Sequence, residues 1–195
     1  MIRMMGATVA LLVAASPVQA GNSLIAPGAK ILVAKSALAV TPASEWNKLG
    51  ARPGRNSESW TLDGDGLNEI TFYGGIPDGR TLFREVDKRN RPLPKVSGTM
   101  LITDIPALLE SSYRIALNTP LMSIDSVEPA RFAGAAGVRF TYSYTRPDSE
   151  VRRLGEARAA MIGGLLYMTT YEAPALYYFE RDLTAFRQIA DSAAL

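Results

Sequence analysis

A strict two-residue alternation in the second half of the chain constrains the fold more than any other feature. Between Val138 and Thr145, apolar or aromatic residues alternate with polar ones, a period typical of a strand with one buried face. Glycine-containing turns at residues 134–137 and 163–164 separate this strand from its neighbours. The pattern predicts an antiparallel meander of four strands: Ser126–Phe132, Val138–Tyr144, Val151–Met161 and Leu165–Glu172.

Two segments outside the meander have the period of an amphipathic helix. Apolar residues recur every three or four positions across Ile105–Leu117 and again across Asp182–Ala193. Asp104 and Asp182 are suitable N-cap residues. Each helix has one apolar face, which it must bury against another element. The expected fold class is therefore α+β, with an antiparallel meander sheet covered by helices.

The first half of the chain is expected to add shorter elements. Asp63-Gly64-Asp65-Gly66 is a hairpin signal between two apolar runs. Thr41 followed by Pro42 predicts a short helix that ends at Leu49. The predicted strands are Ile31–Val40 (one strand or two), Ser57–Leu62, Leu67–Tyr73 and Arg80–Arg84.

The first 20 residues have the pattern of an export signal. Arg3 supplies a positive charge, residues 4–15 are uncharged and mostly apolar, and Val18-Gln19-Ala20 places small residues before a cleavage point. We expect cleavage after Ala20, a flexible lead-in at residues 21–30 and a single domain at 31–195. The apolar run is shorter than the roughly 20 residues that cross a bilayer as a helix. The expected mature product is therefore soluble, periplasmic or secreted, without a transmembrane segment.

Cysteine and histidine are absent from all 195 residues. Their absence excludes a cysteine nucleophile, a Ser-His-Asp triad, disulfide exchange and zinc or haem sites built from these ligands. The chain also lacks a glycine-rich phosphate loop. With 21 basic and 19 acidic residues, it has no bulk charge for coating a polyanion. We expect no cofactor, no metal, no catalytic residue and no nucleic-acid partner.

The last 60 residues have a recognisable order of elements. The strand Val138–Tyr144 is followed by a charged strand, the Gly163-Gly164 turn, the run LLYMTTYEAPALYYF and a closing helix that contains Ala-Asp-Ser. This order resembles the PsbP-like superfamily, mainly over residues 135–194. The resemblance implies an α/β/α sandwich around an antiparallel sheet. It also implies a non-catalytic binding or assembly role, because the superfamily has no shared catalytic motif.

Acidic residues suggest two further interpretations. Asp63 and Asp65 begin like a calcium loop, but position 5 of that motif is Leu67 and position 12 is Gly74. A plain hairpin turn uses the same residues and is favoured. Paired carboxylates are also what a small hydrolase needs. The candidates are Asp63, Asp65, Glu69 and Glu172, whose spacing in sequence does not predict their distances in space.

Tyrosine is concentrated in the second half, with six of the eight between residues 142 and 178. The favoured interpretation is an aromatic core with hydroxyls at its rim. The alternative is an amphipathic pocket for a glycan or an apolar ligand. Its candidate ligand-binding residues are Tyr142, Tyr144, Tyr167 and Tyr171.

Positive charge is concentrated between residues 80 and 95. This segment has six basic and two acidic residues, while the whole chain has a net charge of only +2. Two prolines, Pro92 and Pro94, favour an exposed loop or a sheet edge. The charges then keep the edge from pairing with other strands, or they dock an anionic envelope component or an acidic protein. The candidate partner-binding residues are Arg80, Arg84, Lys88, Arg89, Arg91 and Lys95.

Taken together, these features predict an exported, soluble binding or assembly module of the cell envelope that catalyses no reaction. A small exported hydrolase that uses carboxylates is the alternative from a different class. A carrier of an apolar ligand is a third.

Overall fold

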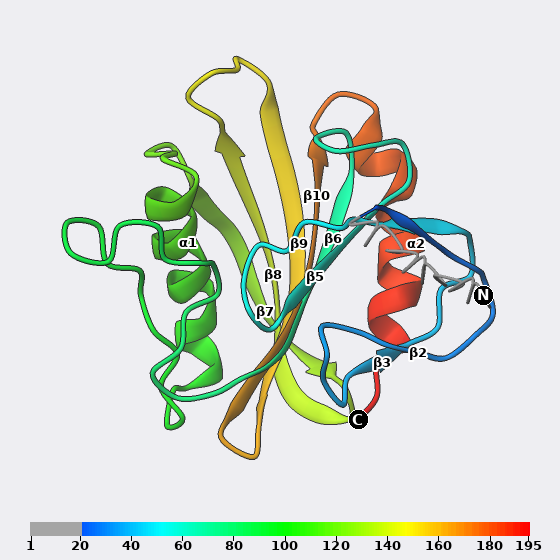
Figure 1. Ribbon diagram of the computed structural model, residues 1–195, viewed down its shortest axis with the longest axis horizontal. Helices are drawn as coiled ribbons and strands as arrows, with labels where there is room; N and C mark the ends of the chain where they lie inside the picture. Colours follow the sequence, from blue (N-terminus) through cyan, green and yellow to red (C-terminus); the bar gives the residue numbers. More distant parts are fainter. Residues whose placement is uncertain (1–20) are drawn as a thin grey trace, which may run out of the picture.

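Figure 1 shows the computed structural model, which describes residues 21–195. The export signal predicted for residues 1–20 lies outside the described residues. Within residues 21–195, eight strands form one sheet in which every neighbouring pair is antiparallel. In order across the sheet they are β1 (Ser23–Ile25), β4 (Trp46–Lys48), β5 (Ser57–Thr61), β6 (Glu69–Ile76), β10 (Leu165–Pro174), β9 (Arg152–Ile162), β8 (Ala135–Thr145) and β7 (Ser123–Phe132). β2 (Ile31–Leu32) and β3 (Ala39–Val40) form a separate pair.

The second half of the sheet is the predicted meander. β7, β8, β9 and β10 follow one another in sequence and are neighbours in the sheet. The apolar and aromatic residues that alternate along β8 are all buried, which confirms the two-residue period. Gly163 and Gly164 have φ values of 59° and 75°. These left-handed conformations are the ones that a tight hairpin turn between β9 and β10 requires.

The two halves of the chain meet where β6 pairs with β10 at the centre of the sheet (Figure 1). The register places Thr71 opposite Thr170 and Glu69 opposite Glu172. A register shift between Leu166 and Met168 bends the pairing at the other end of β10. Two glutamates that are 103 positions apart in sequence therefore become direct cross-strand neighbours.

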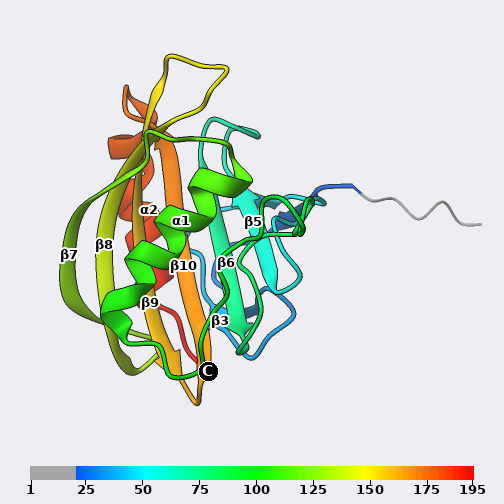
Figure 2. The same ribbon diagram turned by 90° about the vertical axis from the view of Figure 1, so that its left-hand side faces the viewer.

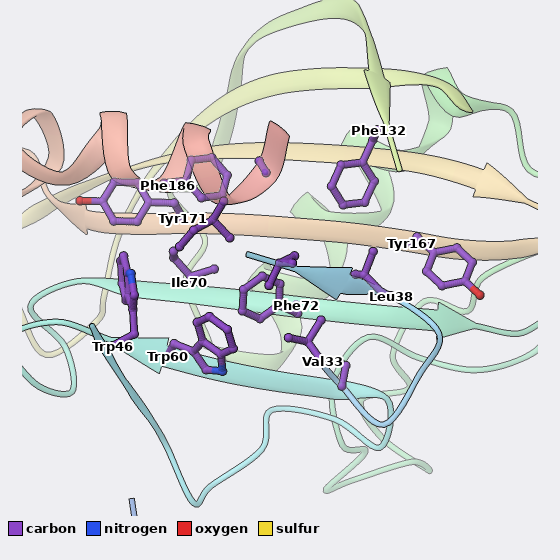
Figure 3. Close-up of a cluster of buried hydrophobic side chains, with 14 of the residues drawn as sticks. Val33, Leu38, Trp46, Trp60, Ile70, Phe72, Phe132, Tyr167, Tyr171 and Phe186 are labelled. Carbon is purple, nitrogen blue, oxygen red and sulfur yellow. The ribbon is translucent and has the colours of Figure 1, made fainter. Parts of the chain in front are cut away.

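One helix packs on each face of the sheet. α1 (Ile105–Ala116) lies across the face that is turned toward the viewer in Figure 2, and α2 (Tyr178–Asp191) lies behind the sheet. The core under α1 includes Leu109, Phe140 and Met168. The core under α2, drawn in Figure 3, includes Phe186 from the helix and Ile70 from β6. The two one-sided helices thus bury their apolar faces as predicted.

The sheet dominates the fold, so the predicted helix-covered sandwich is realised only in part. Over β6, the α1 face is covered by the long irregular segment at 77–101, whose Leu82 and Val96 belong to the same core as α1. On the other face, Val33 and Leu38 (Figure 3), together with Val40, complete the core around α2 from the β2–β3 region. The fold is therefore a mixed α+β fold in which loops share the covering of both faces.

Two short elements of the first half differ from the prediction. The helix expected to end at Leu49 is wrong, because Trp46 is buried and lies on β4, which pairs with both β1 and β5. Burial of the indole in the sheet outweighs the local capping signal. The lead-in at residues 21–30 contains β1, so part of it is held in the sheet.

Two other predictions also differ from the structure: one predicted strand is absent, and one predicted helix begins earlier. The segment Arg80–Arg84 is not a strand but part of the irregular segment at 77–101. α2 begins at Tyr178, four residues before the predicted start, and Asp182 lies inside the helix. The carboxylate of Asp182 accepts a hydrogen bond from Asn68 Nδ2 at 2.8 Å instead of capping the helix. No helix among residues 21–195, the short 3-10 helix η1 (Ile102–Asp104) included, has the length and hydrophobicity needed to span a membrane.

Candidate functional site

The four candidate tyrosines lie on opposite faces of the sheet. Tyr142 and Tyr144 belong to the core under α1, whereas Tyr167 and Tyr171 belong to the core under α2. Tyr171 stacks on Phe186 with ring centroids 5.5 Å apart, and its hydroxyl donates to a backbone carbonyl of α2. The structure therefore brings each pair together but does not combine the four into one pocket.

Under α1, three tyrosine hydroxyls converge on the carboxylate of Glu172. Tyr113 Oη donates to Glu172 Oε2 at 2.7 Å, and Tyr144 Oη donates to Glu172 Oε1 at 2.6 Å. Tyr142 Oη lies farther away, at 3.4 Å from Oε2. All four side chains are buried. A buried carboxylate needs such donors, because leaving it unsatisfied is costly.

Two arginines complete the surroundings of this carboxylate. Arg153, which is buried, has Nη2 at 3.9 Å from Glu172 Oε1 and donates from Nε to Tyr144 Oη at 3.0 Å. Arg146 reaches the same carboxylate oxygen at 4.0 Å from a partly exposed position. Burial, reinforced by the charge of Glu172, raises the pKa values of Tyr113 and Tyr142 well above the ordinary value of a tyrosine hydroxyl. The hydroxyls therefore stay protonated and act as donors at neutral pH.

Glu69 lies beside this cluster on β6. Burial, followed by the charge of Glu172, raises its pKa above the ordinary value of 4.5. Thr71 donates to Glu69 Oε1 at 3.1 Å and shares a hydrogen bond of 2.8 Å with the hydroxyl of Ser59. A hollow of about 180 Å³ opens at this point. It is lined by Pro53, Glu69, Thr71, Tyr73, Phe83, Tyr113, Leu117, Arg146 and Glu172.

The sequence named both glutamates but missed Tyr73, Tyr113 and Arg146 as their neighbours. The helical period places Tyr113 on the buried face of α1, yet nothing in that period indicates what the face covers. A strand at residues 67–73 and another at 165–172 were both predicted, but their pairing was not. The pairing of β6 with β10 is the step that creates this site.

The acidic turn between β5 and β6 has the contacts of a structural turn. Asn68 donates to Asp63 Oδ2 at 2.6 Å, and Arg181 also pairs with Asp63. The side-chain oxygen of Asn68 accepts backbone N–H groups of the turn at 2.9 and 3.1 Å. Among residues 21–195, no group of three or more acidic side chains is arranged to hold a metal ion.

The basic segment at 80–95 runs over the surface without helix or strand. Within residues 21–195, none of its six basic side chains forms an ion pair. Arg91 has a structural contact, because it donates to the carbonyl of Ile115 at 2.8 Å at the carboxyl end of α1. Hydrogen bonds from Asn90 lower the pKa of Asp87, which closes a turn in the segment. Val86, beside this turn, is 97% exposed.

The segment borders two hollows of about 320 Å³ each. Arg80 and Arg84 line the first together with Arg55, which sequence reasoning missed. The second lies between the segment and the end of α1 and is lined by Arg84, Val86, Asp87, Arg91, Leu93, Ile115 and Ala116. The remaining predicted basic residues, Lys88, Arg89 and Lys95, are exposed and line neither hollow.

The architecture defines a class of α+β protein: a large antiparallel sheet that ends in a meander, with one helix on each face. Over 94% of its length the chain is similar to the solution structure of cyanobacterial PsbP (CyanoP) from Synechocystis sp. PCC 6803, with 15% identity, 98% coverage of that chain and a TM-score of 0.53. The chain therefore has the PsbP-like fold that its last 60 residues predicted.

A more distant likeness is to the crystal structure of LpqN, a protein involved in cell envelope biogenesis of Mycobacterium tuberculosis. It covers 89% of this chain and 82% of that chain, with 10% identity and a TM-score of 0.35. No known family model and no curated protein matches the sequence.

Proposed function

We propose that the chain is a non-catalytic binding or assembly module of the cell envelope, and that its basic segment at 80–95 docks an anionic envelope component. The observation that carries this proposal is the group of six basic side chains without an ion pair to any residue in 21–195. In the rest of residues 21–195, eight of the fourteen other basic side chains form an ion pair, as Arg187 does with Glu156. Long irregular loops inside a packed fold are commonly functional.

An anionic lipid surface is the component that the segment fits best. Val86 is almost fully exposed; Glu85 and Asp87 are its immediate neighbours, and Arg84, Lys88 and Arg89 come directly outside them. An exposed apolar side chain in a loop with an excess of basic residues is typical of segments that rest in the headgroup region. Each nearby basic residue contributes about 1 kcal/mol of attraction to an anionic leaflet. An acidic protein face is the competing partner.

The test is co-sedimentation with phosphatidylglycerol and phosphatidylcholine vesicles at two salt concentrations. The variant is Lys88→Ser/Arg89→Ser/Lys95→Ser, which leaves Arg91 in its contact with α1. We expect binding to the anionic vesicles only, weakened by salt because the Debye length falls from ~10 Å at 0.1 M to ~3 Å at 1 M. The variant should bind more weakly. Equal sedimentation of wild type and variant would refute lipid docking and leave an acidic protein as the partner.

Export is part of this proposal. The pattern of Arg3, the apolar run and Val18-Gln19-Ala20 supports cleavage that leaves Gly21 as the first residue. Amino-terminal sequencing of the protein isolated from its host is the direct measurement. A bulk population that still begins with Met1 would contradict export by this route.

A hydrolase that uses carboxylates is a second candidate, favoured by one observation. Glu69 and Glu172 are cross-strand neighbours at a hollow, and the pKa of Glu69 is raised by burial and by the charge of Glu172. Two acids in different environments are the arrangement that general acid and base chemistry uses. The test is hydrolysis of a panel of chromogenic glycosides and esters. Activity that Glu172→Gln abolishes in a folded protein would support this candidate over the binding module.

A further inference from the structure

We infer that Arg55, Arg80 and Arg84 form a binding site for the phosphomonoester group of a membrane lipid. This inference rests on the proposed docking function and names the chemical group that it recognises. The hollow that these arginines line has a volume of about 320 Å³, and Asn56, Thr81, Phe83 and Glu85 complete its wall.

The three guanidinium groups are available to a ligand. All three residues are exposed. Within residues 21–195, none of them forms an ion pair or donates a side-chain hydrogen bond. Several arginines elsewhere differ in this respect: Arg153, Arg158 and Arg187 each have a carboxylate partner.

The backbone that presents these arginines is held in place. Arg55 precedes β5 and Arg80 follows β6, so the β5–β6 hairpin brings both flanking loops to the same end of the sheet. The N–H of Arg84 donates to the carbonyl of Pro53 at 2.8 Å. A Cβ on Gly54 would lie 2.1 Å from the carbonyl oxygen of Leu82, so only glycine permits this close packing of the two loops. A site with a fixed backbone loses little entropy when a ligand binds.

The charge of the hollow matches a phosphomonoester. Three arginines and Glu85 give its lining a net charge of +2. A phosphomonoester carries a charge of about −1.5 to −2 at pH 7 and has three strong acceptor oxygens. Guanidinium groups donate in pairs to phosphate oxygens, and three of them supply donors from several directions. A phosphodiester or a carboxylate has a single negative charge and fits this excess of charge less well.

The position of the hollow favours a lipid as the source of this group. Arg84 also lines the neighbouring hollow, where Val86 is 97% exposed. The arginine site and the apolar tip of the segment therefore lie next to each other. A protein that rests on a membrane through Val86 therefore brings this neighbouring site close to the lipid headgroups.

The test compares two kinds of anionic vesicle that carry the same surface charge. One contains phosphatidic acid, a phosphomonoester, and the other contains phosphatidylglycerol, a phosphodiester, each diluted with phosphatidylcholine. The protein is the chain from residue 21 onward, which includes both described cores, with the full chain measured alongside it. The site variant is Arg55→Lys/Arg80→Lys/Arg84→Lys, which keeps every charge but removes the paired donors of guanidinium. The matched control is Lys88→Ser/Arg89→Ser/Lys95→Ser, which removes charge outside the hollow.

We expect the wild type to bind phosphatidic acid about tenfold more tightly than phosphatidylglycerol, which corresponds to one strong paired hydrogen bond. The site variant should lose this preference and still bind both vesicles. The control should bind both vesicles more weakly and keep the preference. Equal binding of the wild type to both vesicles would overturn the phosphomonoester site while leaving the docking function standing. Absence of binding to either vesicle would overturn both.

Inorganic phosphate distinguishes the source of the group. Added to vesicles of phosphatidic acid, it should compete only weakly, because it lacks the contribution of the membrane surface. Tight binding of inorganic phosphate without vesicles, lost in the site variant, would assign the site to a soluble phosphomonoester. That result would overturn the lipid as the source.

Discussion

Replacing Tyr113 by phenylalanine tests whether the tyrosine hydroxyls stabilise the buried Glu172. The substitution removes one oxygen and leaves the ring, which packs edge-to-face on Phe83 with centroids 5.4 Å apart. It also removes the 2.7 Å hydrogen bond to Glu172 Oε2, which leaves that oxygen with only the longer contact to Tyr142 at 3.4 Å. A hydrogen bond to a charged group contributes about 1.5–3 kcal/mol. We therefore expect Tyr113→Phe to lower the free energy of unfolding by about 2 kcal/mol.

Urea denaturation followed by tryptophan fluorescence measures this loss as a lower midpoint with an unchanged slope. In thermal unfolding the same loss corresponds to about 4–8 °C in a chain of this length. The matched control is Tyr167→Phe. Tyr167 is also buried, but its hydroxyl has no hydrogen bond to another residue in 21–195, so the expected change is under about 0.5 kcal/mol. Equal losses in the two variants, or no loss in Tyr113→Phe, would refute the role of the hydroxyl.

Three other changes test the core, the packing of the sheet and the titration of Glu69. Phe186 is fully buried against Tyr171, so Phe186→Ala should cost about 3–5 kcal/mol; an unchanged urea midpoint would mean that α2 is not docked. A Cβ on Gly155 would lie 2.1 Å from the ring of Tyr142, so Gly155→Ala should lower the melting temperature through a clash of about 1–3 kcal/mol or more. The raised pKa of Glu69 means that the folded state binds its proton more tightly than the unfolded state, so stability falls as pH rises above the ordinary value of 4.5. Glu69→Gln should therefore be more stable than the wild type at neutral pH, and urea titrations across pH should show this advantage disappearing below pH 4.5.

The meander could be predicted from sequence because its signals are local. The alternation along β8 and the glycines at 163–164 each specify one strand or one turn without reference to distant residues. The helix expected before Leu49 was wrong for the converse reason. Its capping signal is local, but the burial of Trp46 depends on β1 and β5, which come from other parts of the chain. Local patterns predict an element well only where tertiary packing agrees with them.

The same distinction between local sequence signals and tertiary pairing applies to the candidate site. Glu69 and Glu172 were named as candidates, but the pairing of β6 with β10 joins two predicted hairpins, and neither hairpin specifies its neighbour. The proximity of Arg55 to Arg80 is different, because the sequence does contain a local signal that predicts it. The hairpin predicted around residues 63–66 places the residue before its first strand and the residue after its second strand at the same end. Arg55 and Arg80 flank that hairpin, so their proximity follows from the turn.

Phe83 connects the buried cluster to the basic segment. Its ring lines both the Glu69–Glu172 hollow and the arginine hollow, and it packs between Tyr73 at 6.3 Å and Tyr113 at 5.4 Å. Leu82, its neighbour in sequence, is fully buried. The first part of the basic segment is thus anchored in the core under α1.

The middle of the segment, residues 85–91, is held by surface contacts instead. Between residues 85 and 91 the hydrogen bonds include those of the Asp87–Asn90 turn and the one from Arg91 to α1, and Lys88 and Arg89 are exposed. Donors on an anchored backbone select a ligand by geometry, whereas charges on a loosely held loop attract any anion within a Debye length. Specific recognition is therefore expected at Arg80 and Arg84, and general attraction at Lys88 and Arg89. For this reason the Arg55→Lys/Arg80→Lys/Arg84→Lys variant should change the preference between lipids, whereas the Lys88→Ser/Arg89→Ser/Lys95→Ser variant should change the overall strength of binding.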